Sequence, residues 1–312
     1  KPVYLFYGEE AYLKQQYKNR LKNAVLPEGD TINLSIYSGK GIDVKEMIAQ
    51  ADTMPFFAEH RLLLIEDSGF FKNANQQLAE YIPSIPEETI MLFVESEVDK
   101  RGKLYKAVSK KGSVVEFTAQ NEQTLTRWIL GILKTEGKMI TSGAMKQFLE
   151  KTGTDMERIR QELEKLICYC MEKESITEED VAVICSEQTE NKIFDMINAM
   201  AEKKQKKAME LYYDLLALKE PPMRILYLIT RQFNLLMQVK ELSEEGYSAK
   251  TISERLKMAG FIVRNCLRQA EYFSLKTLKE PLQDCVRMEE AVKTGRMNDV
   301  MSVELLLVKY SS

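Results

Sequence analysis

Two carboxylates stand at the position of this 312-residue chain where a nucleotide-binding protein would carry its phosphate loop. They are Glu9 and Glu10, which follow the apolar run Val3–Tyr7 and a single glycine, Gly8. A phosphate loop needs Gly-rich backbone amides around the phosphates, a Lys that neutralises them and a Ser or Thr that holds magnesium. This segment lacks the Gly-Lys-Ser/Thr pattern, and its carboxylates would repel a triphosphate. The sequence therefore predicts that the chain does not hydrolyse ATP.

A second acidic pair, Glu66 and Asp67, closes the apolar run Leu62–Ile65. In a nucleotide-hydrolysing enzyme, an acidic pair at such a strand end would hold magnesium and activate water. Without a phosphate loop the pair has no nucleotide to act on, so a solvent-facing strand end or a cap on the next turn is favoured. The sequence also lacks nucleophile-elbow and dinucleotide-binding motifs. We predict no catalytic residues and no cofactor, with an α/β nucleotide-binding enzyme of divergent phosphate site as the alternative.

The histidine and cysteine content excludes most metal chemistry. His60 is the one histidine in the sequence, so a two-histidine zinc site cannot form within the chain. The cysteines are odd in number and lie in helical-looking sequence, which is typical of reduced thiols in a cytoplasmic protein. They are Cys168, Cys170, Cys185, Cys266 and Cys285. Cys168 and Cys170 are closely spaced, but the sequence has no second cysteine pair and no histidine near them. We therefore predict no metal site.

The overall charge argues against attraction of the whole chain to nucleic acid, since 44 Lys and Arg face 47 Asp and Glu, giving a net charge of -3. The sequence has neither the ~18 consecutive apolar residues of a membrane helix nor a signal-peptide pattern at its start. We therefore expect a cytoplasmic protein.

Two basic clusters could contact the phosphates of DNA. The alternative is that each is only a solvated helix face, and this alternative is favoured for the second cluster. The clusters are Lys100, Arg101, Lys103, Lys106, Lys110 and Lys111, and the run Lys203–Lys207.

The elements that must position these residues fall into three predicted domains. In residues 1–120, short apolar runs alternate with helical stretches, which indicates a parallel α/β domain with helices on both faces of the sheet. The expected strands are Val3–Tyr7, Ile32–Tyr37, Leu62–Ile65, Thr89–Val94 and Ser113–Phe117.

After residue 120 the strand signals stop and apolar residues recur at helical spacing. Residues 121–186 predict a small helical domain, in which the segment beginning at Ser175 starts a helix with Thr177 and Asp180 forming a capping box. Residues 187–312 predict a second helical domain of long amphipathic segments. One segment, Arg224–Leu242, carries a broad apolar stripe, which favours the core of a helix bundle over an oligomerisation face.

The connector between a predicted helix and the third strand holds unusually large apolar side chains: Met54, Phe56 and Phe57 surround the helix-breaking Pro55. Such side chains on a short connector are suited to a partner's pocket, because they can be buried there without reorganising the domain. Composition alone favours the other reading, in which both phenylalanines fold back into the domain's own core.

Several segments, in order along the whole chain, resemble the delta subunit of the bacterial DNA polymerase III clamp loader. They are Tyr4–Leu13, Met54–Leu62 leading into Leu63–Asp67, Gly153–Asp155 followed by Gln161–Leu166, Ile176–Val181 and Ile225–Phe233. Each match is moderately specific, and their ordered combination is strong.

The resemblance implies an AAA+-type fold without a phosphate loop, a helical lid over 121–186 and a helical collar over 187–312. It implies a non-catalytic subunit of the DNA polymerase III holoenzyme, a DNA-directed DNA polymerase and nucleotidyltransferase, which acts in DNA replication. Its expected partners are the sliding clamp (beta subunit), the tau/gamma and delta prime subunits of a hetero-pentamer, and primer-template DNA. The subunit would bind and open the clamp, with Met54, Phe56 and Phe57 entering a clamp pocket and Pro55 shaping the turn.

One departure and one alternative within the same class accompany this resemblance. The tip of the connector is a Phe-Phe pair, where other members of the family can have Leu-Phe. A delta-prime-like silent subunit is the alternative, but it would be expected to carry a Ser-Arg-Cys motif and often zinc-binding cysteines. The sequence has neither.

Overall fold

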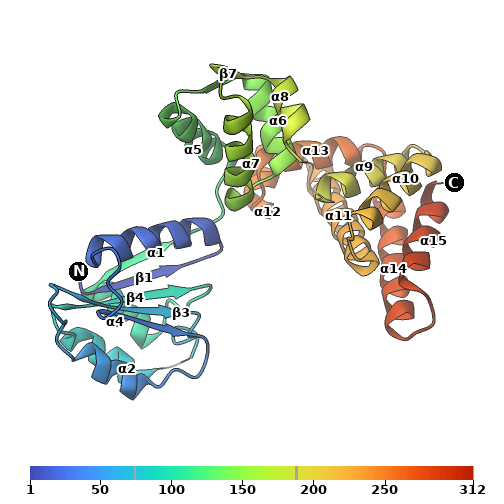
Figure 1. Cartoon of the computed structure of the whole chain (residues 1–312). Helices are drawn as coiled ribbons and strands as arrows, with labels where there is room; N and C mark the ends of the chain where they lie inside the picture. Colours follow the sequence, from blue (N-terminus) through green and yellow to red (C-terminus); the bar gives the residue numbers. More distant parts are fainter. Residues whose placement is uncertain (74, 187–188, 312) are drawn as a thin grey trace. The chain divides into compact units, whose positions relative to one another are not determined.

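The computed structural model describes residues 1–73, 75–186 and 189–311 (Figure 1). The chain divides into two compact units, Lys1–Gln120 and Asn121–Ser312. The further division of the second unit at 186/187 stays a prediction, and residues 187 and 188 lie outside the described part. Across the described residues, the structure contains no helix long and apolar enough to cross a membrane.

The first unit is built on a five-stranded sheet with the order β2-β3-β4-β1-β5, in which every pairing is parallel. All five strands form where the apolar runs predict them. They are β1 (Val3–Tyr7), β2 (Leu34–Ser38), β3 (Arg61–Glu66), β4 (Thr89–Glu95) and β5 (Ser113–Glu116). The second strand begins two residues later than expected. The Asp30 carboxylate accepts hydrogen bonds from the backbone N–H groups of Ile32 and Asn33, both at 3.0 Å, which holds them in a turn.

Helices cover both faces of this sheet, as the alternation of elements predicts (Figure 1). On one face α1 (Ala11–Val25) packs on a core that includes Phe6 and Leu92. On the other face α2, α3 and α4 pack on a core that includes Leu5 and Phe93. These helices are α2 (Val44–Ala51), α3 (Gln76–Tyr81), which continues into a 3₁₀ turn over Ile82–Ser84, and α4 (Lys103–Lys111). Neighbouring strand residues thus serve opposite layers, as the strand period of two requires.

The second unit begins with helices and one short sheet, and the sheet corrects the expectation that strands end at residue 120. Met139–Ile140 (β6) pairs in parallel with Ser175–Ile176 (β7). The two strands have two residues each, which is too short to leave a period-two pattern in the sequence. Consequently the predicted helix does not start at Ser175; it starts at Glu178, after the predicted cap Thr177. The helices here are α5 (Glu122–Thr135), α6 (Ser142–Thr152), α7 (Met156–Tyr169) and α8 (Glu178–Ile184).

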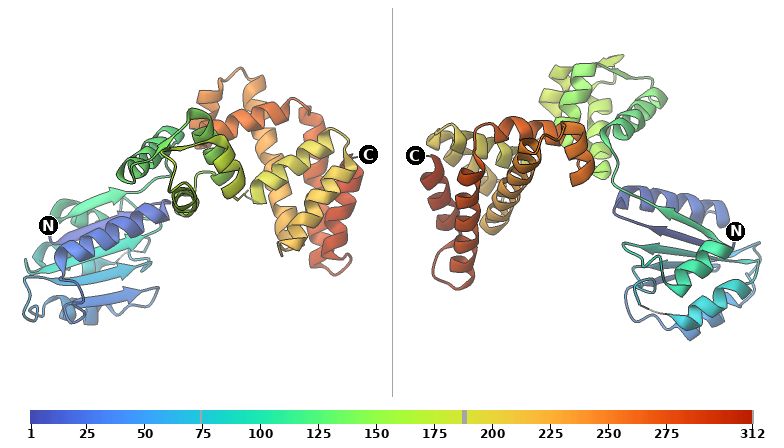
Figure 2. Two further views of the ribbon diagram at one scale, coloured as in Figure 1. Left: turned by 45° about the horizontal axis from the view of Figure 1, so that its top comes forward. Right: turned by 180° about the vertical axis from the view of Figure 1, so that it is seen from behind.

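The rest of the second unit is a bundle of helices (Figure 2). They are α9 (Thr189–Ala201), α10 (Gln205–Ala217), α11 (Pro222–Glu244), α12 (Ala249–Leu256), α13 (Gly260–Ala270), α14 (Leu275–Lys293) and α15 (Asp299–Ser311). The apolar stripe of α11, including Ile225, Ile229 and Phe233, is buried in the core of this bundle. The bundle-core interpretation of the stripe is therefore confirmed.

Replacement of Asp180 by alanine tests the capping box at the start of α8. Hydrogen bonds from Lys173 and from the backbone of Thr177 lower the pKa of the Asp180 carboxyl to about 2. Because this pKa is lower in the folded state, the contribution to stability is complete above about pH 4 and is lost as pH falls towards 2. We expect Asp180→Ala to lower the free energy of unfolding by about 1 kcal/mol at pH 7, and by less at pH 3, in urea titrations followed by circular dichroism.

The matched control is Glu179→Ala, which removes an exposed carboxylate from the same first turn of α8. It should change stability by only about 0.3 kcal/mol, the size of a helix-dipole effect at an exposed site. An Asp180→Ala loss of equal size at pH 7 and pH 3 would contradict the assignment.

Candidate functional site

The connector between α2 and β3 exposes its three large apolar side chains. Phe57 is 97% exposed, Met54 75% and Phe56 57%. The two phenyl rings contact each other edge to face, with their centroids 4.6 Å apart. The composition-based expectation that both rings fold back into the domain's own core is therefore wrong. The residues Met54, Pro55, Phe56 and Phe57 are brought together in one turn, and we call their exposed side chains the apolar tip.

A buried asparagine holds the backbone beneath the apolar tip. The N–H of Phe56 donates to Asn33 Oδ1 at 2.7 Å, and Asn33 Nδ2 donates to the Phe56 carbonyl at 3.0 Å. Asn33 is itself 2% exposed. On the other side of the tip, Arg61 Nη2 donates to the Met54 carbonyl at 3.3 Å. The connector is thus attached to the sheet at the amino ends of two strands, β2 and β3.

The backbone of Phe57 lies in the left-handed region, with φ of +49°. That conformation is uncommon for a bulky residue and carries an energetic cost of about 1–2 kcal/mol. The hydrophobic effect also opposes exposure of a phenylalanine, by about 1.5–3 kcal/mol for full burial of the side chain. Since both preferences are overridden at the same residue, the connector carries the kind of local strain that occurs at functional sites.

The segment after β1 is filled by the chain's own contacts. Glu10 Oε1 accepts a hydrogen bond from the Tyr12 N–H at 3.3 Å and caps α1, so a carboxylate already serves this helix N-terminus. Gly8 has φ of +117°, and a Cβ there would lie 2.3 Å from the Phe117 carbonyl oxygen. The single glycine of this segment therefore permits a close backbone approach to the residue that follows β5.

The acidic pair after β3 is engaged by neighbouring residues. Lys18 of α1 pairs with Glu66 at 2.7 Å, with side chains 12% and 28% exposed. The next carboxylate, Asp67, accepts a hydrogen bond from Ser96 Oγ at 3.3 Å. From the sequence we expected Glu66 and Asp67 to face solvent or to cap the next turn. The ion pair between Glu66 and Lys18 is a contact that sequence reasoning missed.

Sequence reasoning also missed Glu95, a carboxylate that ends β4 and is 3% exposed. It accepts hydrogen bonds from Ser68 Oγ, from the Ser68 N–H at 3.1 Å and from the Gly69 N–H at 3.3 Å. Burial raises the pKa of this carboxyl above its usual value. The signal in the sequence is a glutamate directly after the apolar run Thr89–Val94, but its partner loop cannot be read from that spacing. Its role is to fix the loop that follows β3.

The six basic residues of the first predicted cluster do not form one patch. Lys100 pairs with Glu116 at 2.8 Å near the carboxyl end of the sheet, and Arg101 pairs with Asp99 at 3.0 Å. The hydrogen bond with Glu116 raises the pKa of Lys100. The others are exposed along α4: Lys103, Lys106, Lys110 and Lys111.

The helix α4 runs back along the sheet, so its lysines are spread between the two edges of the sheet. Gly112, directly after Lys111, lies against Val3 at the amino end of β1, where an added Cβ would approach the Val3 carbonyl oxygen to 2.1 Å. A nine-residue helix spans about 13 Å. Lys103 therefore lies towards the carboxyl edge of the sheet and Lys106 near the middle of the helix, whereas Lys110 and Lys111 lie at the amino edge, the edge that also bears the apolar tip.

The second basic run, Lys203–Lys207, is partly used by local contacts. Lys204 pairs with Glu202 at 2.6 Å, and Lys203 Nζ donates to the Tyr310 carbonyl at 3.3 Å. The interpretation of the run as a solvated helix face stays a prediction.

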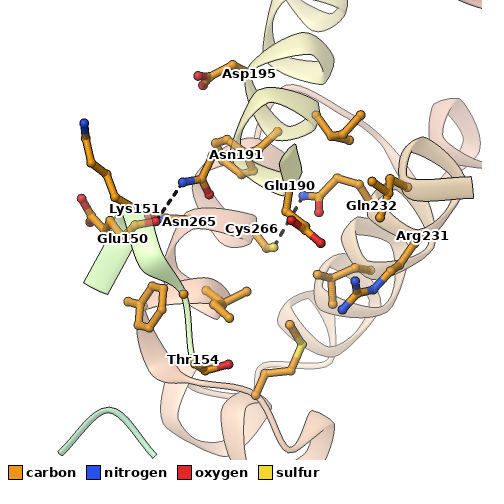
Figure 3. Close-up of a pocket in the computed structure, with 18 of the residues that line it drawn as sticks. Glu150, Lys151, Thr154, Glu190, Asn191, Asp195, Arg231, Gln232, Asn265 and Cys266 are labelled. Carbon is orange, nitrogen blue, oxygen red and sulfur yellow. Dashed lines mark hydrogen bonds between the residues drawn. The ribbon is translucent and has the colours of Figure 1, made fainter. Parts of the chain in front are cut away.

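The second unit contains a cavity of about 650 Å³ (Figure 3). Its walls come from the end of α6 and from α9, α11 and α13, and it carries both acidic and basic side chains, among them Glu190 and Arg231. Gln232 Nε2 donates to Cys266 Sγ at 3.8 Å at its wall. Burial raises the pKa of Cys266 to about 11, which disfavours the reactive thiolate. The described residues contain no group of three or more His, Cys, Asp or Glu arranged to hold a metal.

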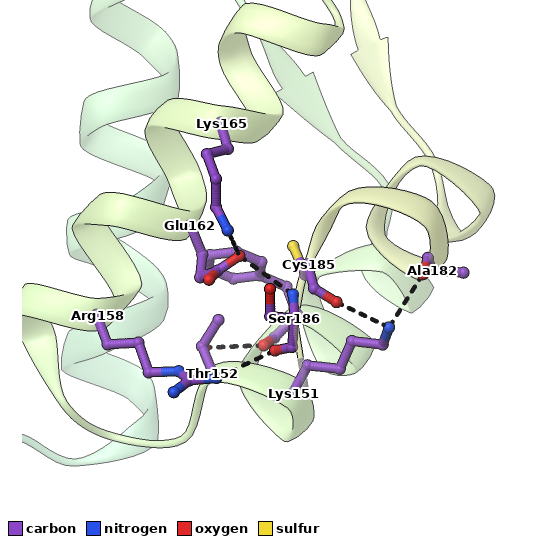
Figure 4. A network of polar contacts seen from close by, with 9 residues as sticks. Lys151, Thr152, Arg158, Glu162, Lys165, Ala182, Cys185 and Ser186 are labelled. Atoms are coloured by element: carbon purple, nitrogen blue, oxygen red, sulfur yellow. Dashed lines mark hydrogen bonds and ion pairs between the residues drawn. The ribbon is translucent and has the colours of Figure 1, made fainter. Parts of the chain in front are cut away.

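A polar network fixes the chain where α8 ends (Figure 4). Lys151 Nζ donates to the carbonyls of Ala182 at 3.1 Å and Cys185 at 3.0 Å, satisfying acceptors that a helix end leaves free. Arg158 donates to the Ser186 carbonyl at 3.2 Å, and Glu162 accepts from the Ser186 N–H at 3.3 Å. These are capping contacts.

All five cysteines are free, and their environments differ. Cys168 is exposed, whereas the other four are buried. Desolvation raises the pKa of every buried thiol: to about 12 for Cys185, to about 11 for Cys266 and Cys285, and upwards for Cys170.

Comparisons with known proteins agree over both units. A family model described as "DNA polymerase III, delta subunit" matches residues 4–118, and one described as "DNA polymerase III delta subunit, C-terminal domain" matches residues 190–310. The chain is 30% identical to DNA polymerase III subunit delta of Bacillus subtilis (strain 168), over 99% of this chain and 92% of that protein. It is 21% identical to a probable DNA polymerase III subunit delta of Aquifex aeolicus (strain VF5), over 78% and 72% of the two chains.

A solved structure supports the same assignment. The Bacillus subtilis DNA clamp loader delta protein matches with a TM-score of 0.69 and 30% identity, covering 100% of this chain and 95% of that one. The predicted fold class, an AAA+-like parallel-sheet domain followed by helical domains, is confirmed by this match and by the strand order. The chain therefore belongs to the family of DNA polymerase III delta subunits, the delta subunits of the bacterial clamp loader.

Proposed function

We propose that this delta subunit binds the sliding clamp (beta subunit) through Met54, Pro55, Phe56 and Phe57 and opens the ring for loading onto primed DNA. The observation that carries the proposal is the exposure of the apolar tip. The Phe57 side chain is 97% exposed, although hydrogen bonds hold the backbone of the connector in place. A few large apolar side chains that enter a pocket together commonly supply most of the affinity of an interface. Its partners in the ring are the tau/gamma and delta prime subunits, and the complex works in the cytoplasm.

The same proposal assigns ATP hydrolysis to other subunits and no catalytic residues to this chain. Glu10 caps α1 where a phosphate would need free N–H groups, and Lys18 is paired with Glu66. A triphosphate at this position would have to displace both contacts and approach two further carboxylates, those of Glu9 and Asp67. This arrangement argues against a divergent nucleotide-binding enzyme.

Contact with primer-template DNA is proposed for the basic residues of the first unit. Because Lys100 and Arg101 are paired with carboxylates, the exposed lysines of α4 are the stronger candidates. The two lysine pairs of α4 are tested separately, since their midpoints lie about 9 Å apart along the helix axis.

The first prediction from the proposed function concerns the apolar tip. In calorimetry with the clamp of the same organism, the double variant Phe56→Ala, Phe57→Ala should bind at least about 100-fold more weakly, because burial of two phenyl rings is lost. The matched control is Tyr272→Ala, since Tyr272 is 58% exposed, like Phe56, but lies in the second unit. Unchanged affinity of the double variant would rule out the apolar tip as the clamp-binding element.

The second prediction concerns nucleotide. We expect the isolated chain to show no saturable binding of a fluorescent ATP analogue and no ATP hydrolysis, since the acidic and capped segment after β1 offers no phosphate site. The affinity for the clamp should be equal with and without ATP. Saturable binding that Lys18→Met weakens would instead favour a divergent nucleotide-binding enzyme.

The third prediction concerns DNA and uses the reconstituted clamp loader. Each lysine that contacts a phosphate should contribute about 0.9 to the slope of log affinity against log salt. Two double variants test α4: one carries Lys103→Gln with Lys106→Gln, and the other carries Lys110→Gln with Lys111→Gln. The control double variant, from the second basic run, carries Lys206→Gln with Lys207→Gln. A slope lowered by one α4 pair assigns the contact to that end of the helix. Slopes unchanged by both α4 pairs would exclude α4 from DNA contact.

A further inference from the structure

Asn33 does not belong to the apolar tip, yet it contacts the backbone of the tip twice. We infer that Asn33, oriented by Asp30, is a positioning residue that holds Phe56 and Phe57 in their binding geometry before a partner arrives. This inference rests on the proposed function, in which the apolar tip enters the clamp. It adds that the tip of the isolated chain is already shaped for binding and does not become ordered only on contact.

The hydrogen bonds of Asn33 leave its orientation little freedom. Its amide oxygen accepts from the Phe56 N–H, while the two hydrogens of Nδ2 serve the Phe56 carbonyl at 3.0 Å and Asp30 Oδ2 at 2.8 Å. The amide therefore binds Phe56 as a neighbouring strand would, with one donor and one acceptor. A carboxylate offers no donor and a hydroxyl only one, so among short side chains the amide is suited to all three bonds.

Asp30 fixes the turn from which Asn33 projects. Its Oδ1 accepts from the backbone N–H groups of Ile32 and Asn33, each at 3.0 Å, while Oδ2 accepts from the Asn33 side chain. Hydrogen bonds from Asn33 hold the pKa of the Asp30 carboxyl below its usual value, because they favour its charged form. One ionised side chain thus orders both the backbone and the amide of Asn33.

Positioning is needed because the connector has no regular structure of its own between Ala51 and Arg61. Phe57 is almost fully exposed in a left-handed backbone conformation, and neither property is favourable for a free loop. A loop that samples many conformations must be ordered when it binds, which weakens its apparent affinity. Asn33 removes part of this loss in advance, and its own burial at 2% exposure leaves it little surface for direct contact with a partner.

The test uses Asn33→Ala in the full chain. We expect the affinity for the sliding clamp, measured by calorimetry, to fall about tenfold, since two hydrogen bonds that order the tip are lost. Hydrogen exchange of the Phe56 amide, which donates to Asn33, should become faster, while amides within β3 such as that of Leu63 remain protected. Unchanged affinity and unchanged exchange at Phe56 would overturn the inference.

The matched control is Asn75→Ala. Asn75 also accepts a backbone hydrogen bond, from the Leu78 N–H at 3.0 Å, but it caps α3. This variant should lose stability and keep the clamp affinity. An equal loss of affinity in both variants would mean that general destabilisation, and not positioning, explains the effect.

A double-mutant cycle separates this inference from the proposed function. Asn33→Ala should have no further effect in the Phe56→Ala, Phe57→Ala background, because the rings it positions are gone. A further loss there would make Asn33 a direct contact and overturn the inference. If the tip variant binds normally, the proposed function fails; if the tip variant loses affinity and Asn33→Ala does not, the inference alone fails.

Asp30→Ala covers the case in which Asn33→Ala does not fold. Asp30 is only half-buried, and its loss leaves the Asn33 amide in place without its orienting partner. We expect a loss of clamp affinity of about threefold, with faster exchange at Phe56. Normal affinity and normal exchange at Phe56 in this variant would count against the orienting role of Asp30.

Discussion

Apolar side chains remain in water only where the backbone beneath them is held by contacts that outweigh their tendency to collapse. In this delta subunit those contacts are the two hydrogen bonds between Asn33 and Phe56 and the bond from Arg61 to the Met54 carbonyl. Both anchoring residues sit at the amino ends of parallel strands, and the strands are fixed by a core on each face of the sheet. The packed sheet is therefore what allows three apolar side chains to stay exposed.

The opposite edge of the same sheet carries polar contacts. At the carboxyl ends of the strands, where parallel α/β proteins bind ligands, the chain has Glu10 as a helix cap, the pair of Lys18 with Glu66, and the buried Glu95. Glu10 bonds the first turn of α1, Lys18 of α1 pairs with Glu66 of β3, and Glu95 of β4 accepts from the loop that follows β3. One edge of the sheet thus carries these polar contacts, while the other presents the apolar tip.

The sequence predicted the fold well where a pattern is long enough, and the site by residue type more than by geometry. The strands of the first unit follow from continuous apolar runs, and the cap of α8 follows from Thr177 and Asp180. The β6–β7 pair was missed because two residues carry no periodicity. The bond of Asn33 to Phe56 joins positions 23 apart, and the separation of the α4 lysines depends on how that helix crosses the sheet; neither is encoded in local spacing. The exposure of the phenylalanines ran against composition and was implied only by the family resemblance.

The uneven burial of the cysteines has a practical consequence. Four thiols are desolvated, with pKa values raised by burial, whereas Cys168 is open to solvent at the end of α7. Since the thiolate is the reactive form, alkylating reagents at neutral pH meet one favourable position in the native chain. A fluorophore attached there would label the second unit and leave the residues of the first unit that carry the phenylalanines unmodified.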